Sequence, residues 1–202
     1  MAYNLIDLNY SSKPKDCCYF FDSNILLPVL GLPPRKGTDK YLSFFQAVYN
    51  HAQTIDVCKI YTCSNQLSEV FNVLMHIELK KRYGPDQQVA FPNIKDFYKR
   101  GFRPSGEYKK AFTLYKNEFE TYIDAFKFSS PNEKVTIKDT LAFDAQKLDL
   151  NDQIILQVVQ NTGAILVSDD GDFYGEDLTQ ATFNTTLIKR SRDNIRPTIK
   201  KT

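Results

Sequence analysis

The chain has 202 residues, of which 42% are hydrophobic and 25% are charged, and its formal net charge is +2 at pH 7. This composition is ordinary for one soluble globular domain, and the charge neither requires nor excludes a nucleic-acid partner. The sequence argues against a membrane or secreted protein, because no apolar run approaches ~20 residues and the N-terminus lacks the charged-then-apolar layout of a signal peptide.

The first part of the chain alternates predicted strands and helices. Residues 1–16 are expected to form a flexible leader in front of a domain at 17–190. The elements expected next, in order, are a strand at 17–21, a short helix at 25–30, a helix at 38–52, a strand at 57–62 and a long helix at 64–83. The first strand ends at Asp22, and Glu69 lies in the second turn of the long helix.

The cysteines indicate a reducing compartment. None of the four cysteines, Cys17, Cys18, Cys58 and Cys63, forms a Cys-x-x-Cys pair, and the chain has only two histidines. This pattern disfavours a zinc site and predicts reduced, half-buried thiols. We therefore expect a cytoplasmic protein. The two histidines, His51 and His76, are isolated in the sequence, which makes a nuclease based on histidine acid and base chemistry a poor hypothesis.

From residue 84 the composition shifts, and proline punctuates the chain. We expect a helical insertion at about 84–130, with helices at 93–99 and 106–126, because the segment is too short to bury a core of its own. A brief strand is expected at 134–138.

The stretch from Leu148 to Phe173 carries the strongest local signal. An almost wholly apolar helix is expected to follow Asn151 and Asp152 and to end at Gly163, which suits the left-handed conformation past a helix end. The apolar segment that follows at 164–167 is typical of an interior strand of a parallel sheet. An edge strand at 182–188 and a flexible basic tail at 191–202 are expected to follow.

Alternating strands and helices predict an α/β fold with a mostly parallel sheet. Four acids, Asp22, Glu69, Asp152 and Asp170, then fall at the carboxyl ends of strands or in the N-terminal parts of helices, which is the edge where open α/β sheets bind ligands. Each acid alone is explained as a cap, a turn or a solvated charge. Together they would repel one another unless a cation neutralised them, and oxygen-only ligands favour Mg²⁺ or Mn²⁺.

The same residues resemble the motifs of the PIN-domain nucleases, which include the VapC-like toxins. The family opens with a strand ending in Asp-(Thr/Ser)-Asn, matched by Asp22, Ser23 and Asn24. Its second acid follows a Ser or Thr by five residues, as Glu69 follows Ser64. The third opens a buried helix, as Asp152 does, and the last motif is matched by Ser168, Asp170, Asp172 and Phe173. Asp149 competes with Asp152 for the third position, and Asp169 falls outside the motif.

This resemblance implies a three-layer α/β/α fold and a metal-dependent endoribonuclease that hydrolyses single-stranded RNA, with one or two Mg²⁺ or Mn²⁺ ions. The metal ligands it implies are Asp22, Glu69, Asp152 and Asp170, with Asp172 as a further candidate, and Asn24 and Ser168 orient carboxylates or waters. The resemblance also makes an antitoxin protein and a homodimer possible partners, in addition to the RNA substrate. The insertion at 84–147 is longer than in compact members, so the choice of substrate does not carry over.

Basic residues in the insertion are candidates for binding the substrate. Five of them, interleaved with aromatic residues, are Lys99, Arg100, Arg103, Lys109 and Lys110. The equally plausible alternative is an ordinary solvated helix face.

Two rival functions are a PIN-like RNA-binding or scaffold protein with weak catalysis, and a phosphohydrolase with an aspartate nucleophile. The second would need an acid two residues after Asp22, where this chain has Asn24.

Overall fold

The computed structural model describes residues 3–34, 37–131, 137–142 and 146–195. Its centre is a six-stranded, wholly parallel sheet with the order β1-β6-β5-β2-β3-β4. The strands are β1 (Asn4–Asp7), β2 (Tyr19–Phe21), β3 (Ile60–Thr62), β4 (Phe126–Phe128), β5 (Ile165–Val167) and β6 (Thr179–Thr182). The predicted α/β class with a parallel sheet is therefore confirmed.

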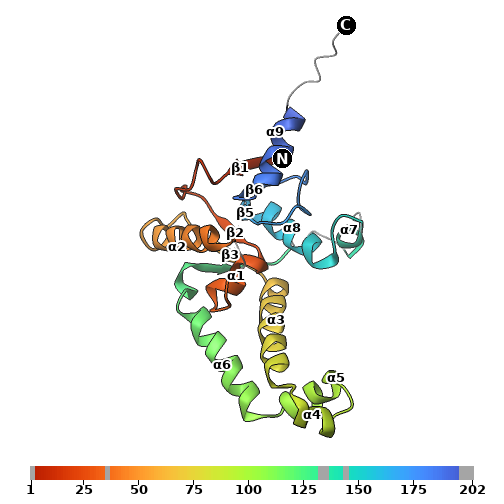
Figure 1. The fold of residues 1–202 in the computed structure, drawn as a ribbon. Coiled ribbons are helices and arrows are strands. Elements are labelled where there is room, and N and C mark those ends of the chain that lie inside the picture. The colour runs from red at the N-terminus through yellow and green to blue at the C-terminus, as the bar shows by residue number, and fades with distance from the viewer. Residues whose placement is uncertain (1–2, 35–36, 132–136, 143–145, 196–202) are drawn as a thin grey trace.

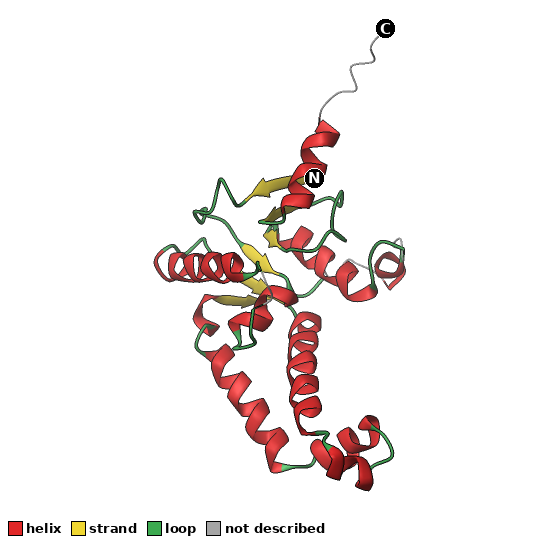
Figure 2. Cartoon of the chain, in the orientation of Figure 1, coloured by secondary structure: helices red, strands yellow, loops and turns green. Residues whose placement is uncertain are grey.

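Helices connect these strands and cover the sheet (Figures 1 and 2). The α-helices are α1 (Ser23–Val29), α2 (Asp39–Thr54), α3 (Ser64–Arg82), α4 (Pro85–Ala90), α5 (Ile94–Asp96), α6 (Gly106–Glu120), α7 (Ile137–Leu141), α8 (Leu150–Thr162) and α9 (Thr185–Ile195). A π-helix, η1 (Phe97–Phe102), and a 3₁₀-helix, η2 (Ile123–Ala125), lie in the insertion. No helix within the described residues is long and apolar enough to cross a membrane.

The alternation of side chains along the central strands produces the three layers. In β2, Tyr19 and Phe21 point to the core on the side of α2, where the Phe21 and Phe45 rings lie 5.0 Å apart. Phe20 points to the opposite core, which α8 closes with residues such as Val158. Because consecutive strand residues face opposite sides, a run of three large aromatics can serve both cores. The result is an α/β/α arrangement.

The sheet reverses its direction of growth at the pair β2 and β5. The chain proceeds from β2 to β3 and β4 on one side and then returns to place β5 and β6 on the other. Phe21 lies in register with Val167 at the carboxyl ends of the two strands. Such a switch point leaves a crevice where parallel sheets bind ligands, and it places the residues after β2 and β5 side by side.

Two predictions at the chain ends are wrong. Residues 1–16 were expected outside the domain, but β1 pairs in parallel with β6 and extends the sheet. The edge strand expected at 182–188 instead ends at Thr182, and the chain enters α9. Asn184 explains the change, because its side-chain oxygen accepts hydrogen bonds from the backbone of Thr186 at 3.0 Å and begins the helix.

The insertion at 84–130 differs in part from its prediction. It contains the short helix α4, which was not predicted, and the helix expected at 106–126 ends at Glu120. Phe126–Phe128 then form β4, which pairs with β3 and adds an edge strand to the sheet. The strand expected at 134–138 falls mostly outside the described residues, and the described part that follows forms α7.

Candidate functional site

The candidate site lies at the switch point of the sheet, where β2 and β5 end. The backbone amide of Asp22 donates to the carbonyl of Val167 at 2.9 Å, so the turn after β2 is fixed against the end of β5. Asp22 is buried, with 7% of its surface exposed. The aspartate that follows the first aromatic strand is therefore held inside the protein rather than at a solvated helix cap, and its side chain makes no capping hydrogen bond to α1.

A hydrogen-bonded chain joins Asp22 to the acids after β5. The Ser168 hydroxyl donates to Asp22 Oδ2 at 2.8 Å, and the same hydroxyl oxygen accepts from the backbone of Asp170 at 2.9 Å. Asp170 Oδ1 in turn accepts from the backbone of Asp172 at 3.1 Å. Ser168 is fully buried, so this serine orients one carboxylate while it shapes the turn that presents the next.

Glu69 reaches the same edge from α3. The start of this helix is fixed by buried Gln66, which accepts from the Thr62 hydroxyl at 2.9 Å and donates to the carbonyl of Phe21, the last residue of β2. One turn later, Glu69 Oε2 accepts from the Ser23 hydroxyl at 2.7 Å. Ser23 was not among the predicted site residues. The signal was present in the Asp-Ser-Asn motif, but only the folded chain shows that the serine binds the glutamate.

At α8, the structure distinguishes Asp149 from Asp152. Asp149 is the N-cap and accepts from the backbone of Asp152 at 2.9 Å, while the Asp152 carboxylate accepts from the backbone of Asp149 at 3.3 Å. This reciprocal capping box satisfies two amides that the helix leaves free. Asp152 also interacts electrostatically with Asp22 and Asp170, whereas among these acids Asp149 acts on Asp152 and Asp172.

Burial and neighbouring carboxylates raise the pKa of three acids at the site, Asp22, Asp152 and Asp172. Burial, followed by the charges of Asp170 and Glu69, raises the pKa of Asp22 to about 6, although the Ser168 hydrogen bond opposes this. The pKa of Asp152 is also raised to about 6, chiefly by burial and further by Asp149, Asp22 and Asp170. Burial and Asp170 raise the pKa of Asp172. The site therefore concentrates negative charge that its surroundings do not compensate.

Within the described residues, no lysine, arginine or histidine forms an ion pair with the four acids Asp22, Glu69, Asp152 and Asp170. In that same part of the chain, no three His, Cys, Asp or Glu side chains are gathered closely enough to hold a metal ion as they stand. The donor set, which is carboxylate oxygen with one buried and uncompensated member, suits a hard divalent cation. Its side chains would have to close around that cation.

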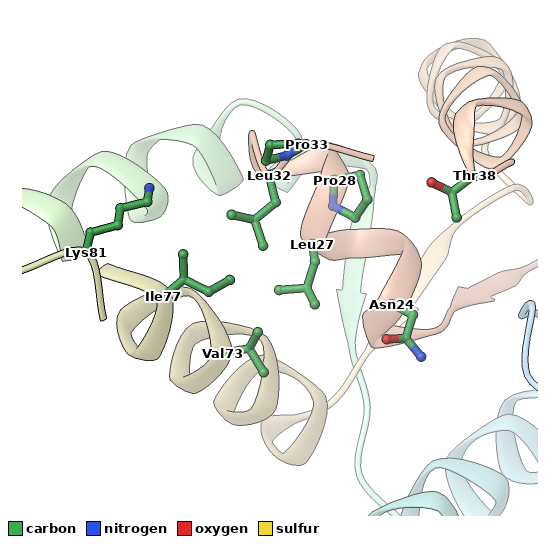
Figure 3. A pocket seen from close by; sticks show the side chains of 9 residues that line it. All are labelled: Asn24, Leu27, Pro28, Leu32, Pro33, Thr38, Val73, Ile77 and Lys81. Atoms are coloured by element: carbon green, nitrogen blue, oxygen red, sulfur yellow. The ribbon is translucent and has the colours of Figure 1, made fainter. Parts of the chain in front are cut away.

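Two other residues near the acids face away from them. Asp169 accepts a hydrogen bond from the Tyr41 hydroxyl at 2.8 Å, which directs its carboxylate toward α2. Asn24, which was expected to orient a carboxylate, is exposed and lies at one end of an apolar pocket of about 420 Å³ between α1 and α3. Figure 3 shows Asn24 at one end of this pocket and Lys81 at the other, with Val73 and Ile77 of α3 between them.

The five basic residues predicted to bind substrate do not adjoin the acids. Lys99 and Arg100 lie on η1 and Arg103 directly follows it, while Lys109 and Lys110 lie in the first turns of α6. Figure 1 shows these elements near the far end of the arm formed by α3 and α6, away from the sheet. The sequence could not show this separation, because it depends on the length and direction of α3.

Comparisons with solved structures find two distant likenesses. The crystal structure of VapBC2 from Rickettsia felis bound to a DNA fragment from its promoter matches with 14% identity and a TM-score of 0.44, over 82% of this chain and 98% of that chain. PAE2754 from Pyrobaculum aerophilum matches with 13% identity and a TM-score of 0.43, over 87% and 98% of the two chains. Neither protein-family models nor curated proteins give a significant match. At these TM-scores the likenesses carry no argument about fold or activity.

Proposed function

We propose that this protein is a metal-dependent endoribonuclease that hydrolyses phosphodiester bonds of single-stranded RNA. The observation that carries the proposal is Asp22, a buried carboxylate without an ion pair at the switch point of the sheet. Three further carboxylates act on it or on one another there. A protein keeps such an arrangement at a cost in stability, because buried charges without a partner are unfavourable.

In this proposal Asp22, Glu69, Asp152 and Asp170 hold Mg²⁺ or Mn²⁺, with Asp172 next to them. The cation would lower the pKa of a bound water, neutralise charge on the scissile phosphate and stabilise the leaving oxygen. The chain's own hydroxyls position the ligands, because Ser168 fixes Asp22 and Ser23 fixes Glu69. We assign these two serines to orientation rather than to proton transfer.

The alternative is a PIN-like RNA-binding or scaffold protein with weak catalysis. The observation in its favour is that the acids within the described chain do not form a closed group of three. The two functions differ in whether a cation draws the side chains together. The basic residues do not distinguish the two functions, because a nuclease and a scaffold would both use them to bind RNA.

The test is cleavage of a labelled, unstructured single-stranded RNA by the purified full chain with Mg²⁺, with Mn²⁺ and with a chelator. We expect cleavage only with a divalent cation, and its loss in Asp22→Asn and Asp152→Asn. Asp169→Asn is the matched control, because this neighbouring aspartate bonds to Tyr41 outside the carboxylate group. A folded, cation-replete wild-type protein that leaves RNA intact would favour the scaffold instead.

An antitoxin partner also belongs to this proposal. A toxin of this kind would be inhibited by a protein encoded beside it, so co-expression with the product of the adjacent small gene should relieve growth arrest in cells that make the wild-type chain. The Asp22→Asn variant should arrest growth neither with nor without that product. Arrest by this variant as well would show that toxicity has another cause.

A further inference from the structure

The arm built by α3 and α6 carries the strongest positive charge of the chain. Residues 80–110, here called the basic tip, contain nine Lys and Arg and three Asp and Glu, whereas the whole chain has a formal net charge of only +2. The rest of the chain is therefore net negative. The acids lie at the switch point of the central sheet, and the basic tip lies at the far end of the arm; these two sites are here called the acidic pole and the basic pole (Figure 1).

The basic tip is a packed unit rather than a loose loop. Buried Phe97 and Phe102 of η1 stack with ring centres 6.3 Å apart, and Arg82 at the end of α3 lies over the Phe102 ring at 5.6 Å. Gly101 allows this packing, because an added Cβ would lie 2.6 Å from the Phe97 ring. The aromatic side chains turn inward, so that Lys99 and the neighbouring cations face solvent.

α3 fixes the distance between the two poles. Glu69 near its start and Arg82 at its end are separated by a helix that advances ~1.5 Å per residue, which gives about 20 Å. The helix is held against α6 by Glu78, which is buried and accepts hydrogen bonds from the Tyr115 hydroxyl at 3.0 Å and from Lys81 at 2.7 Å. Phe71 of α3 and Phe112 of α6 also pack together.

A continuous surface connects the poles. Val73, Ile77 and Lys81 follow Glu69 at successive intervals of four residues, which places them on neighbouring turns of α3. These three residues form one wall of the pocket that begins at Asn24, two residues after Asp22 (Figure 3). The pocket is apolar along its length and cationic at its far end.

We propose that the basic tip is a second anchor for the RNA substrate, and that α3 acts as a ruler which sets the shortest RNA that is cleaved efficiently. The inference rests on the proposed function. One segment of the strand lies at the acids, its bases pass along the apolar wall of the pocket, and its phosphates further along contact Lys99, Arg100 and Arg103. A polyanion is the occupant that suits this pole, because nine Lys and Arg against three Asp and Glu give residues 80–110 a strong positive charge.

The span predicts a length. A stacked strand advances ~3.4 Å per nucleotide, so about 20 Å corresponds to roughly six nucleotides. RNA shorter than this would contact the acids alone, whereas longer RNA would contact both poles. We expect kcat/KM to rise about tenfold or more as the length passes roughly six nucleotides and then to level off, with the change mainly in KM.

The experiment measures cleavage of unstructured oligonucleotides from about four to about twelve nucleotides by the full chain with Mn²⁺. In Lys99→Glu/Arg103→Glu, which removes two cations without an ion pair in the described chain, the gain for long RNA should be lost. The salt dependence of long-RNA binding should weaken by about 1.4 in log–log slope, ~0.7 for each lost phosphate contact. Lys13→Glu/Lys15→Glu is the control, because it makes the same change in charge in the connection between β1 and β2, outside the basic tip.

Several results would overturn the ruler. One is equal kcat/KM for short and long RNA in the wild type, and another is an equal loss in the tip and control variants, which would indicate only long-range attraction. Competition by a poly-glutamate peptide as strong as that by RNA of equal charge would show a generic acid-binding surface. Cleavage of short RNA without a gain for long RNA leaves the proposed function intact, whereas cleavage of neither removes both.

Discussion

Replacing Asp22 by asparagine should make the cation-free protein more stable at neutral pH, although it abolishes the proposed activity. Asparagine has nearly the shape of aspartate and retains an oxygen that can accept the Ser168 hydroxyl. What it removes is the charge, which is buried beside Asp170 and Glu69. The substitution therefore separates the electrostatic cost of the site from its packing.

The magnitude follows from the pKa. Folding raises the pKa of Asp22 from 3.8 to about 6, and each unit corresponds to ~1.36 kcal/mol, so ionised Asp22 destabilises the fold by roughly 3 kcal/mol above that pH. The folded state holds the Asp22 proton more tightly than the unfolded state does. The stability that protonated Asp22 contributes is therefore fully present below about pH 3.8 and is lost as the pH rises through about 6. Asparagine cannot ionise, so the Asp22→Asn variant retains this stability at every pH.

The assay is urea or thermal unfolding of wild type and Asp22→Asn in chelator, at about pH 7.5 and about pH 3.5. We expect the variant to unfold ~6–12 °C higher at the upper pH and nearly with the wild type at the lower. Asp193→Asn, an exposed acid on α9, is the control and should change stability by only a few tenths of a kcal/mol. With Mg²⁺ at about 100 times its Kd, the wild type should gain ~2.7 kcal/mol and the variant much less.

Lower stability of Asp22→Asn at about pH 7.5, or a difference that does not depend on pH, would refute the reasoning. Either result would mean that the ionised carboxylate is compensated by a partner, and the case for a cation at the switch point would lose its main support.

Three other substitutions test the scaffold around the site. Glu78→Gln should lower stability at neutral pH by ~1–3 kcal/mol. Hydrogen bonds from Lys81, Arg82 and Tyr115 outweigh burial and lower the pKa of Glu78 to about 2. The loss of stability, measured by urea titration, should therefore vanish as the pH falls toward about 2. Asp149→Ala should cost ~1 kcal/mol through the lost helix cap while RNA cleavage persists, whereas Asp152→Ala should abolish cleavage; the opposite order of activities would assign Asp149 to the cation. Gly101→Ala should destabilise the protein by ~1–3 kcal/mol in urea unfolding, and a neutral result would mean that the η1 packing relaxes freely.

The sequence predicted the elements that have strong local patterns. α2, α3 and α8 carry apolar residues at helical spacing, and Gly163 ends α8 in the left-handed conformation, with φ of 64°, as expected. The central strands β2 and β5 are short apolar runs that need no partner to be recognised. Because parallel strands end at one edge, the neighbourhood of Asp22 and Asp170 followed from these strands alone.

The sequence did not predict the edges of the sheet. β1 and β4 are short and partly exposed, so neither has the pattern of a buried strand, and each forms only because a remote neighbour offers free backbone groups. The π-helix η1 was also missed, since its form depends on how the Phe91 and Phe97 rings pack around Gly101. Local propensity does not contain such information.

Within the site, the acids could be predicted and their partners could not. The serines that hold Asp22 and Glu69 come from other strands and turns, 146 and 46 residues away in sequence. Asn24, and not Ser23, was predicted to orient a carboxylate, but the first turn of α1 directs the Ser23 side chain toward Glu69 and places Asn24 at the pocket. The rotation of the helix between two consecutive residues thus determines which of them contacts the glutamate.

The strand β4 has a consequence for how this protein can change. The chain leaves the sheet through β3 and α3, builds the basic tip, and returns through α6 to β4, which lies directly beside β3. The excursion thus begins and ends on the two neighbouring strands at one end of the strand order, and the first of them, β3, also pairs with β2. Its outer part is a replaceable module: segments of other length or charge can be exchanged there while the acids keep their framework. Under the proposed function, substrate preference and chemistry in this chain could then vary independently.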